Sequence, residues 1–201
     1  MNGRASRRWL LLAGMLGVAL DGCRRRPVDI GAVLTANTLG SAYLQEGQLP
    51  EAEAEFRRVV ELAPWIAAGY ANLALVYLQS GRYEDAAVQI RRALERDSAS
   101  SEIRHLRAKL HEVSGRADQA RTELEALLAR NPDDVEALYA LARFVAGSSD
   151  SASRVGRLAY LTRIVELEPS NLAARLQLAS ALAGGGEADS AVGQLEALRR
   201  Q

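Results

Sequence analysis

A spacing of 34 residues recurs along the chain and constrains its fold more than any other feature. Three sets of residues keep this spacing: Gly47, Gly81 and Gly115; Ala52, Ala86 and Ala120; and Pro64, Ser98 and Pro132. A fixed period of this length is typical of stacked supersecondary units, each of which buries its apolar face against its neighbours. The spacing therefore predicts a repeat protein rather than one globular core.

Within one unit the order is Leu39-Gly40-x-x-Tyr43, then Gly47, then Ala52-x-x-x-Phe56, then Pro64. This pattern resembles the tetratricopeptide repeat, a 34-residue pair of helices A and B. The resemblance covers residues 33–201 and implies an all-α, right-handed superhelical solenoid of about five helix-turn-helix repeats. The repeats are expected at residues 33–66, 67–100, 101–134, 135–171 and 172–201. In this family Gly40 and Ala52 face each other and let the two helices approach closely.

Two repeats depart from the pattern. The third places Arg107 where the family has Leu and His111 where it has Tyr. The fourth is longer by three residues, because Pro132 and Pro169 are 37 residues apart. We expect the extra residues in a loop at 147–153, which is either a solvated connection or a contact for a partner.

The first 22 residues resemble a signal peptide. Arg4, Arg7 and Arg8 precede an apolar run of 12 residues, Trp9–Leu20, which is short for a bilayer span and typical of a signal-peptide core. The two adjacent arginines also resemble a twin-arginine export signal. Residues 1–22 are therefore predicted to direct export, and residues 23–32 to form a tether.

Cys23, the sole cysteine, follows the apolar run directly. Leu20, Gly22 and Cys23 match the bacterial lipobox, whereas Asp21 departs from it, since a small uncharged residue is usual there. The resemblance implies lipidation of Cys23 and a membrane-anchored protein of the cell envelope that faces the periplasm or the cell exterior. An uncleaved or differently cleaved signal, with an inert Cys23, is the alternative.

Charge and residue spacing give no indication of catalysis. Six of the 25 basic residues and one of the 25 acidic residues lie within residues 1–26, so the remainder has a net charge of −5. This acidic body argues against a nucleic-acid partner. His105 and His111 are six residues apart, so they point to different sides of a helix, and the spacing is not that of a helical zinc site. We therefore predict no catalytic site, no cofactor and no metal.

The resemblance implies a concave groove lined by helix A of each repeat. At repeats 3 and 4 the family positions that face this groove fall on His105, Lys109, Tyr139 and Arg143, and those at repeats 1 and 2 are mostly apolar. We expect the four side chains along one basic and aromatic strip. A partner segment would stack on Tyr139 and offer carboxylates to Lys109 and Arg143. Ordinary solvated residues on a wide surface are the alternative.

These observations favour a non-catalytic scaffold that binds a protein or peptide ligand, as an envelope lipoprotein supporting assembly of a larger complex. The alternative is the N-terminal interaction region of a longer secreted protein or enzyme whose functional domain is not in this chain. Self-association through the fifth repeat is a further possibility, since a terminal repeat normally needs a polar outer face.

Overall fold

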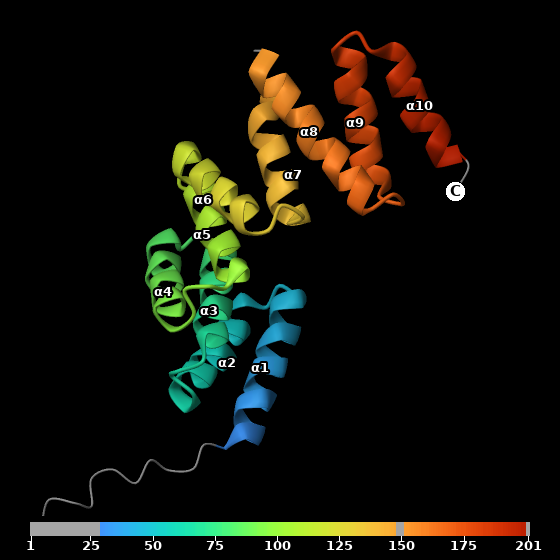
Figure 1. The fold of residues 1–201 in the computed structure, drawn as a ribbon. Helices are drawn as coiled ribbons and strands as arrows, with labels where there is room; N and C mark the ends of the chain where they lie inside the picture. The colour runs from blue at the N-terminus through green and yellow to red at the C-terminus, as the bar shows by residue number, and fades with distance from the viewer. Residues whose placement is uncertain (1–28, 148–150, 200–201) are drawn as a thin grey trace, which may run out of the picture.

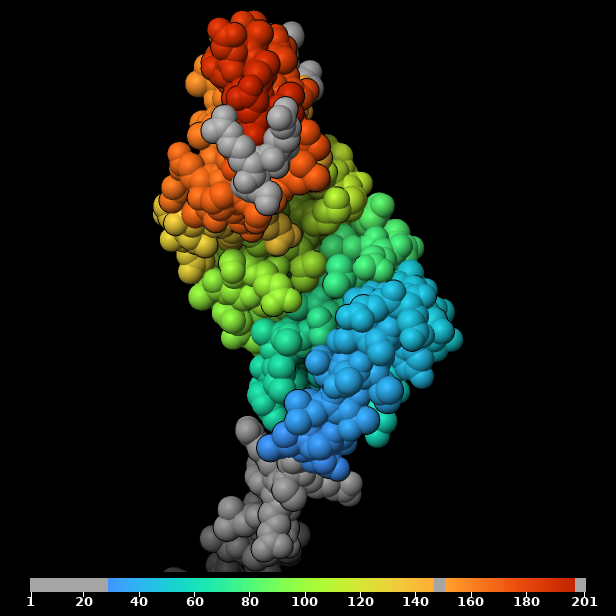
Figure 2. Space-filling view, turned by 90° about the vertical axis from the view of Figure 1, so that its right-hand side faces the viewer, coloured from blue at the N-terminus to red at the C-terminus, as the bar shows by residue number. Residues whose placement is uncertain are grey.

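The computed structural model describes residues 29–147 and 151–199 as a stack of antiparallel helix pairs (Figure 1). The α-helices are α1 (Ile30–Gln45), α2 (Leu49–Leu62), α3 (Ala67–Gln79), α4 (Tyr83–Arg96), α5 (Ser101–Val113), α6 (Ala117–Arg130), α7 (Val135–Phe144), α8 (Ser151–Leu167), α9 (Leu172–Gly184) and α10 (Ala188–Arg199). Each helix packs on the next in the chain, and the repeats succeed one another from the blue to the red end of the molecule (Figure 2). The predicted all-α solenoid of five repeats is confirmed. Among the described residues, no helix has the length and apolarity that crossing a bilayer requires.

Glycine ends helix A in four of the five repeats. Gly47, Gly81, Gly115 and Gly186 have φ values of 74, 71, 73 and 85°. This left-handed backbone costs glycine little. The next residue then donates its N–H to a carbonyl of the last helical turn, as Arg82 does to Tyr77 at 2.8 Å. The recurring glycine is therefore the residue that makes each tight turn between helices A and B.

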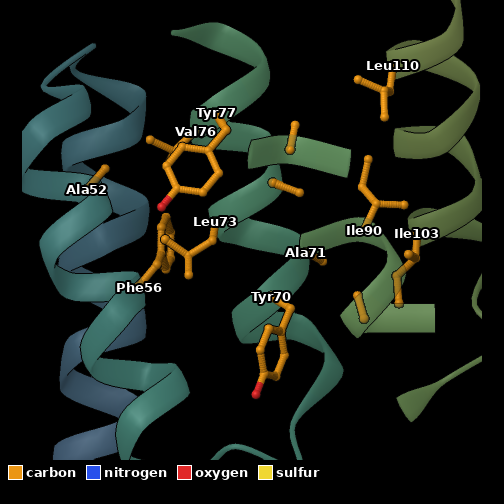
Figure 3. Packing of buried hydrophobic residues seen from close by; sticks show 13 residues of the cluster. Ala52, Phe56, Tyr70, Ala71, Leu73, Val76, Tyr77, Ile90, Ile103 and Leu110 are labelled. Atoms are coloured by element: carbon orange, nitrogen blue, oxygen red, sulfur yellow. The ribbon is translucent and has the colours of Figure 1, made fainter. Parts of the chain in front are cut away.

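Small side chains at helix B let the helices approach. Ala52, Ala86 and Ala120 are completely buried. Gly40 also lies against a larger side chain of α2. A Cβ on Gly40 would lie 2.8 Å from the Phe56 ring, so the close approach is to this ring, one turn beyond Ala52. Phe56 in turn packs among Leu73 and Tyr77 of the second repeat (Figure 3).

The fourth repeat absorbs its extra residues differently from the prediction. After α7 the chain makes one 3₁₀ turn, Val145–Gly147, and α8 already begins at Ser151. The expected loop at 147–153 is therefore shorter, because residues 151–153 form the first turn of α8. Residues 148–150 lie outside the described part of the chain.

The first helix of the solenoid begins earlier than predicted, and the role proposed for the last repeat is untested. α1 begins at Ile30 rather than at residue 33, because the Asp29 side chain accepts the N–H of Ala32 and caps the helix. The predicted signal peptide and Cys23 lie outside the described residues. On α10, Val192 and Leu195 are about half exposed. Self-association through this repeat stays a prediction.

Candidate functional site

The four residues predicted for the groove line one pocket of about 270 Å³ between α5 and α7. His105 and Lys109 come from α5, and Tyr139 and Arg143 from α7. A second hollow of about 680 Å³ adjoins it toward α3 and shares His105, Lys109 and Glu136 with it. The predicted convergence of these side chains is thus observed, and their binding of a partner stays a prediction. The two hollows together are called the groove below.

His105 connects α5 to the start of α7. Its Nε2 lies 2.9 Å from Oδ2 of Asp134, and both side chains are about nine-tenths buried. Asp134 is also the N-cap of α7, where its Oδ1 accepts the N–H of Ala137 at 3.0 Å. His105 therefore fixes the wall of the groove rather than standing free within it.

Tyr139 makes the same kind of connection one repeat further on. Its hydroxyl donates to Oδ1 of Asn171 at 3.0 Å, and Asn171 is the N-cap of α9. Burial raises the pKa of Tyr139, and the hydrogen bond that its hydroxyl donates to Asn171 opposes this shift only in part. The phenol is therefore neutral at physiological pH, and its ring is held as a fixed part of the groove.

Lys109 and Arg143 share one carboxylate, that of Glu112. The Lys109 Nζ lies 3.1 Å from one of its oxygens, and an Arg143 guanidinium nitrogen lies 2.8 Å from the other. Both cations are more than half exposed. Glu112 therefore partly neutralises both cations, and their pairing with a partner's carboxylate stays a prediction.

The larger hollow is acidic rather than basic. Four carboxylates line it: Glu102, Asp133, Asp134 and Glu136. Arg163 of α8 binds Asp133, whereas Glu136 is 76% exposed, and its one ion-pair partner in the described part of the chain is His105, at 3.8 Å. Glu102 has no ion-pair partner among the described residues. This acidic lining lies beside the predicted basic and aromatic strip, whose role in binding stays a prediction.

Apolar side chains also line the groove. Leu75, Leu106 and Val135 line the larger hollow, and Phe144 lines the smaller one. Asn72 donates to Asn37 at 3.0 Å, so this asparagine links α1 to α3 as a structural residue. Within residues 29–147 and 151–199, no group of three His, Cys, Asp or Glu side chains could hold a metal ion.

Fold and groove together define a helical-repeat solenoid with a hollow on the face built by the odd-numbered helices. Two family models described as tetratricopeptide repeat match residues 43–110 and 101–144, which together span just over half of the chain. The chain belongs to the tetratricopeptide repeat family. No curated protein is significantly similar to it in sequence.

Solved structures with the same fold are similar over most of the chain. PilF of Pseudomonas aeruginosa is 20% identical with a TM-score of 0.72, over 85% of this chain and 77% of that one. YrrB, described as a protein with an unusual peptide-binding site, is 19% identical with a TM-score of 0.59, over 84% of each chain. The second tetratricopeptide domain of human RPAP3, solved with an HSP70 peptide, is 22% identical with a TM-score of 0.52, over 57% of this chain and 95% of that domain.

Proposed function

We propose that this protein is a non-catalytic scaffold that holds an extended segment of a partner protein in the groove between α3, α5 and α7. The observation that carries the proposal is the continuous hollow formed by the two adjoining pockets, which share His105, Lys109 and Glu136. The peptide-bound state of the RPAP3 domain and the peptide-binding site of YrrB support this use of the fold.

The charges of the groove favour a basic and apolar segment. Glu102 and Glu136 are exposed carboxylates without a Lys or Arg partner among the described residues, so a partner's Lys or Arg would pair with them. Leu75 and Val135 offer apolar surface beside them, and the Tyr139 ring offers an aromatic contact in the next pocket. Complementary charges mainly give specificity and a faster association rate.

A basic peptide is expected to bind at least about ten-fold more tightly than an acidic one. The probes are two fluorescent dodecapeptides in which Leu and Tyr alternate with either Lys or Glu, titrated into the full-length protein by fluorescence anisotropy. Glu102→Gln with Glu136→Gln should weaken the lysine peptide by about ten-fold or more, and added salt should weaken it further. Equal affinities for the two peptides, or tighter binding of the glutamate peptide, would contradict the proposal.

A matched pair on the other helices serves as the control. Glu61 of α2 and Glu84 of α4 are exposed carboxylates away from the groove. Replacing both with Gln changes the net charge as much as the groove variant does. If this control weakens the lysine peptide equally, the attraction is a property of the whole acidic molecule and not of the groove.

Attachment to the cell envelope is the second part of the proposal. Its support is the position of Cys23 directly after the apolar run and the lipobox-like Leu20 and Gly22. Metabolic labelling with a palmitate analogue should mark the protein, and Cys23→Ala should abolish both the label and retention in the membrane fraction. A labelled Ala variant, or an unlabelled wild type, would contradict lipidation at this residue.

A further inference from the structure

At the junction of the first two repeats, one partly buried carboxylate is held by three side chains. Tyr77 of α3 donates its hydroxyl to Glu53 of α2 at 3.0 Å, and Arg82 contacts the other oxygen at 2.9 Å. Arg57 also pairs with this carboxylate, and the Arg82 guanidinium lies 4.3 Å from the centre of the Tyr77 ring. The rings of Tyr77 and Phe56 fill the rest of this junction (Figure 3).

One repeat further on, the same positions carry a different set of side chains. Adding 34 to each number replaces Glu53 by Ala87, Phe56 by Ile90, Arg57 by Arg91, Leu73 by Arg107, Tyr77 by His111 and Arg82 by Arg116. The second junction therefore keeps the arginines but lacks the carboxylate and both aromatic rings. Its space is open, since these six residues line a hollow of about 510 Å³ between α4 and α5.

The hollow has an excess of positive charge. Arg91, Arg107 and Arg116 line it, and Glu95 is the one carboxylate in its lining. Neither Arg91 nor Arg116 has an acidic partner among the described residues, whereas both of their counterparts, Arg57 and Arg82, pair with Glu53. Arg91 and Arg116 thus stand at positions that bind a carboxylate in the preceding repeat, but the chain supplies no carboxylate here, since Ala87 replaces Glu53.

Buried polar atoms beside the hollow also lack partners. Arg107 gives one guanidinium nitrogen to Glu123 at 2.6 Å, but its buried Nε has no hydrogen-bond partner among the described residues, and neither does Nδ1 of His111. Burial lowers the pKa of His111, and the positive charges of Arg116 and Arg107 lower it further, against a weaker opposing effect of Glu123. An additional negative charge at this place would be favourable for each of these groups.

We propose that this hollow binds an organic carboxylate that carries an apolar or aromatic group. Its carboxylate would lie between Arg91 and Arg116, in the place that Glu53 takes one repeat earlier, since paired guanidiniums suit carboxylate geometry. Its apolar part would fill the volume left by the two missing rings, against Ile90, Leu94 and Leu110. Figure 3 shows Ile90 on the side of α4 that faces Leu110 of α5.

This site is separate from the groove, because no residue of the hollow lines either groove pocket. The two proposals can therefore fail independently. The ligand class is also the opposite of the one expected in the groove, which is basic. A carboxylate of this kind could be a free small molecule or the C-terminus of a protein that ends in an apolar residue.

The test titrates the full-length protein with 3-phenylpropionate and with 3-phenylpropionamide, which has the same shape without the charge. The carboxylate should bind about ten-fold or more tightly than the amide, because charged hydrogen bonds are lost with the amide. In NMR titrations, the carboxylate should raise the pKa of His111, since a nearby anion stabilises the imidazolium. Equal binding of the two probes would overturn the proposal.

Variants of the hollow give the second arm of the test. Ala87→Glu restores the missing carboxylate from within the chain and should weaken the probe by about ten-fold or more without lowering the melting temperature. Arg116→Gln should weaken it as much by removing one guanidinium. Arg92→Gln changes an exposed arginine of α4 that does not line the hollow, and should leave binding unchanged.

A third arm identifies the source of the carboxylate. A tripeptide ending in phenylalanine with a free C-terminus is compared with its C-terminal amide. If the free-acid tripeptide binds as tightly as 3-phenylpropionate, the ligand is a protein C-terminus. If the tripeptide does not bind while 3-phenylpropionate does, the ligand is a free small molecule. If Ala87→Glu is misfolded by circular dichroism, Arg91→Gln takes its place. Unchanged probe binding in the folded Ala87→Glu or Arg91→Gln variant would overturn the proposal.

Discussion

Replacing Phe56 with alanine is expected to lower the free energy of unfolding by about 3–5 kcal/mol. The ring is completely buried and joins two repeats, since it packs on Gly40 of α1 and among Leu73 and Tyr77 of α3. Its removal leaves a cavity that rigid helices cannot close, so the lost contacts are not replaced. Urea denaturation followed by circular dichroism measures the change.

The damage from Phe56→Ala should also be local. Each helix packs mainly on its neighbours in the chain, so the repeats at the far end do not touch this cavity. In hydrogen exchange, the amides of α1–α3 should lose most of their protection while those of α9 and α10 keep theirs. Leu195→Ala, at a residue 46% exposed, should stay within about 0.5 kcal/mol of wild type. An equal loss of protection in all helices would show that the solenoid unfolds as one unit.

The 34-residue period was sufficient to predict the fold because it marks positions with the same environment. Ala52, Ala86 and Ala120 are completely buried, as equal positions in equal packing should be. The glycines that end the A helices share one left-handed backbone conformation for the same reason. A pattern of this kind predicts which residues pack, and in which order.

Features that depend on individual side chains, and not on the repeat, were not predicted. α1 begins three residues early because Asp29 supplies a cap that the repeat pattern does not require. Residues 151–153 belong to α8, although the repeat pattern predicts a loop there. The close approach of the Phe56 ring to Gly40 was not predicted, since it depends on a side chain one turn beyond Ala52 that reaches across the interface.

The groove was predictable in position but not in charge. The groove-facing positions of the family placed His105 and Lys109 in the same pocket as Tyr139 and Arg143. The charge of the groove also depends on residues that the family's groove-facing positions do not include. Asp133 and Asp134, in the turn between α6 and α7, line the larger hollow and make it acidic. The ion pairs could not be predicted from the sequence either, because partners such as Arg143 and Glu112 are 31 residues apart in the chain.

Gly40→Ala is expected to lower the free energy of unfolding by about 1–3 kcal/mol, although alanine is the better helix former. The new Cβ would lie 2.8, 2.9 and 3.0 Å from three atoms of the Phe56 ring. Since this ring is completely buried, it can yield only by displacing other side chains of the core. Steric overlap should therefore outweigh the gain in helix propensity, as urea denaturation will measure.

Two further variants separate the overlap from the propensity. Gly193→Ala lies within α10, where a new Cβ meets no atom within 4 Å, and it should stabilise the protein by about 0.5–1 kcal/mol. In a Phe56→Leu background the ring is gone, so Gly40→Ala should lose most of its cost, giving a coupling energy between the two sites of about 1 kcal/mol or more. An unchanged cost in that background would place the strain elsewhere than at the Phe56 ring.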